Sequence, residues 1–175
     1  MPTYECVDEM TIDGTAAECF ASLADEVAGR SAWWVPFVVM RPKDEGPAGE
    51  RNDLVERLAS PEGTTDRYWS TARMSIRVTG VEADRRVVLK EEGGDFRGFE
   101  EWTFEPLDDD RTLVRVHWLS EPHGLMRLVA PFSRVVEDHS FIVREGLRGM
   151  GHYVAERRRR HRSDGGPGAA DRPRG

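Results

Sequence analysis

Two ionisable side chains stand where the surrounding sequence pattern is apolar. Asp8 lies on the apolar side of an alternating segment, residues 4–13, and His139 lies in the middle of an apolar helical stripe. A buried carboxylate must be paired or have a raised pKa, and a histidine that faces a cavity can donate a hydrogen bond or move a proton near neutral pH. The alternatives are an Asp8 paired with an arginine and a His139 that is only a satisfied core residue. Both residues are therefore weak catalytic candidates.

The tryptophans are the second group that could do chemistry. The 175 residues contain five of them: Trp33, Trp34, Trp69, Trp102 and Trp118. An indole offers a large apolar area and one N–H donor, which suits planar ligands, although ordinary core packing explains such residues equally well. Trp102 and Trp118 make the stronger case, because both fall on the apolar faces of neighbouring predicted strands.

Several kinds of site are not predicted. The two cysteines, Cys6 and Cys19, cannot form a disulfide framework, and the five histidines are too scattered for a structural metal site. The glycine-containing segment 46–49 lacks the Gly-Lys-Ser/Thr ending of a phosphate-binding loop. No Ser-His-Asp spacing or nucleophile-elbow signature occurs. We therefore expect no metal and no cofactor.

The charge is unevenly placed along the chain. The net charge is −7, yet residues 157–175 hold seven arginines, so the rest of the chain is strongly acidic. An acidic body argues against nucleic-acid binding by the folded part. The basic run 157–162 suits a helix C-terminus, where cations stabilise the helix dipole; contact with nucleic acid or an anionic membrane is the alternative. We expect no membrane span, no secretory signal, a cytoplasmic location, and a monomer or weak dimer.

Periodicity predicts one α+β domain over residues 1–160 and a disordered Arg/Gly/Pro-rich tail over 161–175. A strand over 4–13 leads through a capping box, Thr15 and Glu18, into a helix over 16–23 and a second short helix over 25–32. Antiparallel strands are then predicted over 37–41, 53–59, 68–81, 86–91, 99–107 and 112–120. Positions 125, 129, 132, 136, 139, 143, 147, 150 and 154 form the apolar stripe of a long C-terminal helix, with a kink or fresh start near Pro131.

This order of elements resembles the helix-grip fold of the START/Bet v1-like (SRPBCC) superfamily, and within it bacterial polyketide cyclase/dehydrase-like proteins. The resemblance covers roughly residues 4–158. The segments that carry it are Ile12-Asp13 running to Cys19-Phe20, Leu23-Ala24-Asp25, Trp33-Trp34 with Pro36, Gly46 and Gly49, Glu101-Trp102-Thr103-Phe104, and Arg111-Thr112 with Val114 and Val116. It implies a curved antiparallel sheet of about seven strands, wrapped around the long helix and preceded by two short helices.

The resemblance also implies a cavity between sheet and helix for a small hydrophobic or aromatic molecule. Its expected lining is Trp33, Trp34, Met74, Ile76, Trp102, Phe104, Val116 and Trp118, with Phe132, Val136, His139 and Val143 as the lid. The family shares no catalytic set, so two functions stay open. One is a polyketide cyclase/aromatase-type or carrier protein; the other is sequestration that gives self-resistance to a toxic hydrophobic product. A protein-interaction module is a third, and the facing of Arg57 and Arg77 is undetermined.

Overall fold

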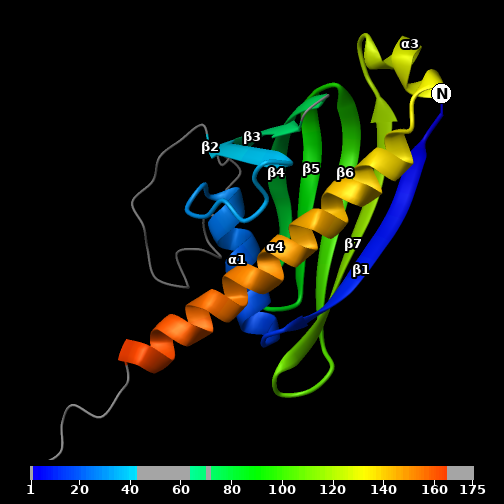
Figure 1. Cartoon of the computed structure of the whole chain (residues 1–175). Coiled ribbons are helices and arrows are strands. Elements are labelled where there is room, and N and C mark those ends of the chain that lie inside the picture. The colour runs from blue at the N-terminus through cyan, green and yellow to red at the C-terminus, as the bar shows by residue number, and fades with distance from the viewer. Residues whose placement is uncertain (1, 43–63, 70–71, 165–175) are drawn as a thin grey trace, which may run out of the picture.

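The chain folds as one curved antiparallel sheet around a long helix (Figure 1). The computed structural model describes residues 2–42, 64–69 and 72–164. Within these ranges, seven strands pair in the order β1-β7-β6-β5-β4-β3-β2. They are β1 (Tyr4–Asp13), β2 (Val38–Pro42), β3 (Thr64–Trp69), β4 (Ala72–Glu82), β5 (Arg86–Gly94), β6 (Phe96–Pro106) and β7 (Arg111–Pro122). Because β1 and β2 lie at opposite edges, the segment between them must cross the concave face.

That crossing begins with helix α1 (Ala16–Val27), whose start the sequence predicts well. The backbone N–H of Glu18 donates to Thr15 Oγ1 at 3.2 Å, and the N–H of Thr15 donates to Glu18 Oε2 at 2.8 Å. This reciprocal capping box satisfies two amide donors that the first helical turn would leave without partners.

Replacing Thr15 by alanine removes one half of the capping box. We expect the free energy of unfolding to fall by about 1 kcal/mol, because the N–H of Glu18 loses its acceptor. Urea unfolding followed by circular dichroism measures this change. Thr15→Ser keeps the hydroxyl and should stay within about 0.5 kcal/mol of the original; an equal loss in both variants would contradict the capping role.

The second short helix expected over 25–32 does not form, because α1 itself continues to Val27 and residues 28–37 make turns. Gly29, at φ 68°, ends the helix in the left-handed conformation. The buried carboxylate of Glu26 accepts hydrogen bonds from Ser31 Oγ at 2.7 Å and from the N–H of Trp33 at 3.0 Å. Burial raises the pKa of Glu26. The side chain thus replaces helical hydrogen bonding in the turn that places Trp33 and Trp34.

The central strands follow the predicted alternation with two differences. The single strand expected over 68–81 is divided between β3 and β4, and the strand expected over 53–59 lies outside the described residues. The predicted faces of β6 and β7 are confirmed: Trp102, Phe104, Val116 and Trp118 are all buried. On the opposite face, Arg115 pairs with Glu9 at 3.0 Å.

The C-terminal helical region is interrupted near Pro131, as predicted. Helix α3 (Met126–Val129) and the 3-10 turn η1 (Ala130–Phe132) precede Ser133, which is extended, and then α4 (Val135–Asp164) begins. The extended residue resets the helical phase. Leu125, Val129 and Phe132 therefore lie exposed, whereas the stripe from His139 to Val154 is buried as predicted. Helix α4 also continues to Asp164, so the first residues of the expected tail are helical.

The interior divides into two groups of packed residues. The main core joins α1, the middle of the sheet and α4 from Ile142 to Val154. A second cluster lies at the end of the sheet below α3 and consists of Met74, Phe96, Trp118, Ala130 and Val135, with Tyr4, Cys6 and Met126 at its edge. The second cluster is smaller and lies beside the polar groups described next.

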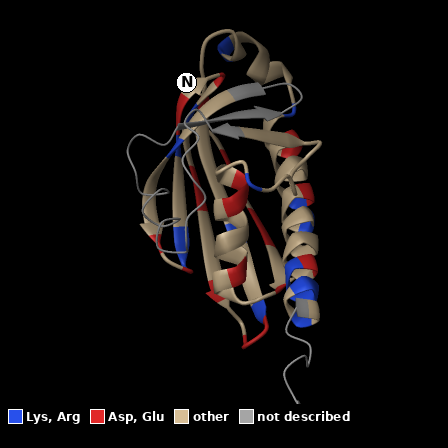
Figure 2. Cartoon of the chain, turned by 90° about the vertical axis from the view of Figure 1, so that its left-hand side faces the viewer, with Lys and Arg blue, Asp and Glu red and all other residues tan. Residues whose placement is uncertain are grey.

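The basic end of α4 lies beside acidic residues of α1 (Figure 2). Arg157 Nη1 is 2.6 Å from Asp25 Oδ2, and Arg158 Nη2 is 2.6 Å from Glu18 Oε2. These arginines therefore help to hold the two helices together. Of the helices that the structure describes, none is long and apolar enough to cross a membrane.

Candidate functional site

Buried polar side chains gather at the second-cluster end of the concave face. Glu91 on β5, Glu100 on β6 and Ser120 on β7 are each at most 1% exposed. Each shares the face of its strand's apolar residues, as Asp8 does on β1. None of the three was predicted from the sequence, although a glutamate two residues from Leu89 and another two residues from Trp102 carry the same signal as Asp8. Glutamate side chains are almost never fully buried unless they are paired, so these residues mark a polar region inside the fold.

Trp118 is the centre of this polar group. Its Nε1 donates to Glu91 Oε1 at 3.0 Å, and Ser120 Oγ donates to the other oxygen of Glu91 at 2.5 Å. One face of the indole stacks on His139, with ring centroids 4.1 Å apart and planes 12° apart. Phe96 meets the same indole edge-on at 5.7 Å. Trp118 therefore joins the apolar cluster to the buried carboxylates.

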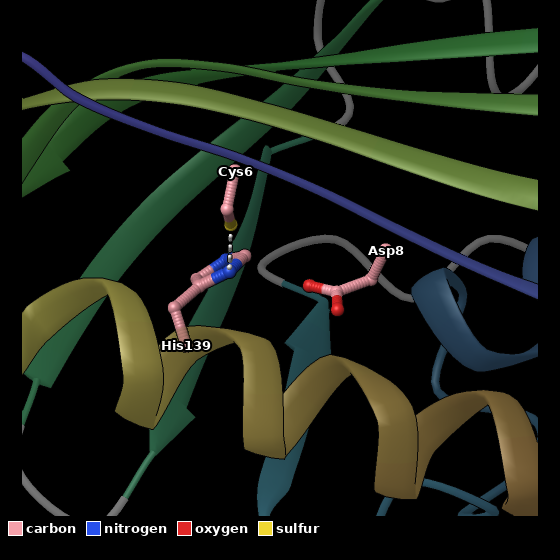
Figure 3. A group of neighbouring side chains, drawn as sticks. All are labelled: Cys6, Asp8 and His139. Atoms are coloured by element: carbon pink, nitrogen blue, oxygen red, sulfur yellow. Dashed lines mark hydrogen bonds between the residues drawn. The ribbon is translucent and has the colours of Figure 1, made fainter.

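His139 projects from the first turns of α4 towards β1 (Figure 3). Its Nδ1 lies 3.4 Å from Cys6 Sγ, and its Nε2 lies 3.5 Å from Glu100 Oε2. The ring is 1% exposed. This histidine therefore lies inside the fold, as its place in the apolar stripe predicted, and both of its nitrogens have polar neighbours. An imidazole held between a thiol and a carboxylate can transfer a proton or bind a metal ion.

Asp8 points inward from β1 to α4 (Figure 3). Its Oδ1 accepts hydrogen bonds from Ser140 Oγ at 2.5 Å and from Arg144 Nε at 2.8 Å. Within the described part of the chain, the buried Oδ2 has no hydrogen-bond partner. The arginine pairing considered from the sequence is therefore confirmed for one oxygen, while the other stays available for a further interaction.

Burial, followed by the nearby carboxylates of Asp8 and Glu100, raises the pKa of the Cys6 thiol from 9.0 to about 12. The thiolate is the reactive form of cysteine. At pH 8 the thiolate population of Cys6 should therefore be about a thousandfold smaller than that of an ordinary thiol, and its reaction with iodoacetamide should be much slower. Its rate should rise tenfold per pH unit from pH 8 to 11, which peptide mass spectrometry can follow. A plateau near pH 9 would contradict the raised pKa.

Most of the remaining predicted lining residues belong to the main core, and one belongs to the second cluster. Trp33, Trp34 and Trp102 pack on one another in the main core, with ring centroids 5.4–6.5 Å apart. Ile76, Phe104, Val116 and Val143 surround them, whereas Met74 joins Trp118 in the second cluster.

The lid prediction is wrong for Phe132, which is 92% exposed on the 3-10 turn before the extended Ser133. Val136 is only half-buried, because Val135, four residues before His139 on the same helix, is the residue that lies on the buried face. The side chains of Trp69 and Arg57 lie outside the described residues. Arg77 pairs with Glu92 at 2.8 Å.

A groove of about 750 Å³ runs between α1 and the C-terminal part of α4, beside Asp25, Arg157 and Arg158. Its charged walls differ from the aromatic lining expected of the interior. The groove therefore does not correspond to the predicted cavity.

Comparison with solved structures identifies the fold. A START superfamily protein from Mycobacterium smegmatis superimposes with a TM-score of 0.62, at 13% identity over 87% of this chain and 97% of its own. The Zhui aromatase/cyclase from Streptomyces sp. R1128 gives 0.60, at 15% identity over 94% and 99%. Norcoclaurine synthase from Thalictrum flavum, in complex with dopamine and hydroxybenzaldehyde, gives 0.58, at 10% identity over 89% and 88%.

The chain thus has the START/Bet v1-like (SRPBCC) helix-grip fold, as the resemblance implied. Neither the protein-family models nor the curated proteins include a match to this sequence.

Proposed function

We propose that the chain binds a small hydrophobic or aromatic molecule, of the polyketide or lipid-like class, at the second cluster. The observation that carries this proposal is the convergence of hydrogen-bonding groups on Trp118 and His139 inside an otherwise apolar interior. Ligand sites combine apolar and aromatic walls with a few placed polar groups. The solved structures of this fold include an aromatase/cyclase and a synthase with two aromatic compounds bound, which supports the same class of ligand.

The position below α3 suits entry of a ligand. Helix α3 has four residues, and Leu128 on it and Leu125 just before it are more than 70% exposed. A helix this short is held by its packing, because isolated helices of this length are unstable in water. Displacing α3 would open the second cluster and leave the main core, which joins α1 to α4, intact.

Within that site His139 is the candidate for proton transfer and Trp118 for stacking on a planar ligand. A cyclase would act mainly by holding a reactive chain in one conformation and excluding water. A carrier or a sequestering protein would use the same contacts without turnover. The proposal therefore concerns ligand binding, and a measurement of turnover distinguishes a cyclase from a carrier or sequestering protein.

The experiment is a native mass-spectrometry screen of the full chain with aromatic polyketides and fatty acids, combined with intrinsic tryptophan fluorescence. We expect a 1:1 complex and a change in fluorescence. His139→Ala should weaken binding about tenfold, since it removes a stacked, hydrogen-bonding ring, whereas His152→Ala on the exposed side of α4 should not. Absence of any complex, together with unchanged fluorescence, would refute the proposal.

Turnover of a bound compound then distinguishes the functions. If His139→Ala lowers kcat more than it weakens binding, the residue transfers a proton. Binding without conversion of any ligand supports sequestration, the alternative function.

A further inference from the structure

A thiol, a carboxylate and an imidazole meet between β1 and α4. Cys6, Asp8 and His139 each offer one ligand atom, and these atoms lie within 4.8 Å of one another. Figure 3 shows the three side chains pointing into one space from β1 and from α4. Cys6 and His139 are 133 positions apart, so this grouping has no signature in the spacing of the sequence.

We propose that Cys6, Asp8 and His139 bind a divalent transition-metal ion, with Zn²⁺ as the best match to a sulfur, nitrogen and oxygen ligand set. Zn–S bonds of about 2.3 Å and Zn–N bonds of about 2.0 Å, at a tetrahedral angle, place the two ligand atoms about 3.5 Å apart. The observed distance from Cys6 Sγ to His139 Nδ1 is 3.4 Å. These two ligands are thus already at the separation that a bound ion requires.

Asp8 supplies an independent indication of a ligand. Among the described residues its Oδ2 is buried without a hydrogen-bond partner, although the side chain is only 2% exposed. Leaving such an oxygen without a partner costs about 1–3 kcal/mol, and more for a charged group. A cation beside Oδ2 would satisfy it.

Neighbouring side chains contact the three ligand residues and hold them in place, as metal sites require. Glu100 Oε2 lies 3.5 Å from His139 Nε2, while Nδ1 of the same ring lies 3.4 Å from Cys6 Sγ. The stacked indole of Trp118 fixes the plane of the same ring. Ser140 and Arg144 hold the other oxygen of Asp8. A carboxylate on a ligating histidine and hydrogen bonds to a ligating carboxylate are the usual supports of zinc.

Two negative charges face the ion when it binds. The Cys6 thiol passes its proton to water, and the resulting thiolate and the Asp8 carboxylate offset the charge of the divalent ion, while Arg144 stays paired with the other oxygen of Asp8. Compensation of this kind is needed in a buried site, where separate charges are costly. Three protein ligands leave one coordination position for water or a ligand oxygen, as in catalytic zinc sites.

This inference goes beyond the proposed binding of an organic ligand and does not depend on it. Its test contains no organic ligand, so a failure of either proposal leaves the other standing.

The test is titration of the chelator-treated full chain with Co²⁺ and Zn²⁺. We expect one ion per chain, visible Co²⁺ bands of tetrahedral intensity, and a near-ultraviolet thiolate charge-transfer band. Cys6→Ser should remove the charge-transfer band and weaken Zn²⁺ binding more than about 100-fold, whereas the buried Cys19→Ser should change neither. Glu100→Gln should weaken binding about 10–100-fold and keep the thiolate band, because it affects only the support of His139.

Metal binding by the unsubstituted protein tests the proposal even if a variant folds poorly. Absence of Zn²⁺ and Co²⁺ binding would overturn the proposal. A Co²⁺ spectrum without thiolate bands, or a band lost in Cys19→Ser instead of Cys6→Ser, would overturn it as well.

Discussion

Trp118→Ala will lower the free energy of unfolding by about 3–5 kcal/mol, the cost of removing a large buried aromatic side chain. The indole is fully buried, stacks on His139, meets Phe96 edge-on and donates to Glu91. Alanine leaves a cavity and takes the donor away from a buried carboxylate, and both effects favour the unfolded state. Guanidinium unfolding monitored by circular dichroism measures the loss.

Phe132→Ala is the matched control. The sequence predicted Phe132 as part of the lid, but the ring is 92% exposed on η1. Its removal should change the unfolding free energy by no more than about 0.5 kcal/mol. A loss in Phe132→Ala that approaches the loss in Trp118→Ala would show that η1 packs on the sheet in solution and that Phe132 does belong to the lid.

Gly149→Ala should cost about 1–3 kcal/mol, although alanine is the better helix former. A Cβ at Gly149 would lie 2.1 Å from the carbonyl oxygen of Trp33, and one at Gly146 would lie 2.4 Å from Trp34 Nε1. Trp34 Nε1 donates to Ile142 O at 2.9 Å, so the turn before β2 rests directly on α4. An added methyl group must push that turn away from the helix and disturb the stacked tryptophans.

Gly151→Ala should change the free energy of unfolding in the opposite direction. There the nearest atom to a new Cβ is Ile12 Cγ2, at 4.0 Å, an ordinary contact. The substitution should stabilise the protein by about 0.5–1 kcal/mol, because it lowers the entropy of the unfolded chain without strain. Thermal unfolding of the Gly149→Ala and Gly151→Ala variants, measured side by side, tests the close contact between the backbone of Trp33 and α4. Equal shifts in both would contradict the close approach.

The parts of the fold that were predictable depend on residues close in sequence. The alternation of β1, the capping box of Thr15 and Glu18, and the interruption near Pro131 each involve neighbours within a few positions. The second short helix predicted over 25–32 does not form, because α1 continues to Val27 and the buried Glu26 carboxylate satisfies the amides of Trp33 and Trp34 in a turn instead.

The candidate site was predictable only in part. His139 and Asp8 were correctly identified as polar residues on apolar faces, and Trp118 as an inward-facing aromatic residue. Glu91, Glu100 and Ser120 carried a comparable signal on their own strands but were missed. The prediction for Phe132 was wrong because the stripe over residues 125–154 was counted in one helical phase through the break predicted near Pro131, and the extended Ser133 resets that phase.

By itself the sequence determined the order of strands and helices, the inward faces of β6 and β7, and the resemblance to the helix-grip fold, because these follow from local periodicity and from the succession of elements. Only the tertiary structure decided that Cys6 and Asp8 lie beside His139, and that Trp118 reaches Glu91. These contacts depend on strand register and on where α4 rests in the sheet. Both are set by contacts between residues far apart in the chain, which no local pattern records.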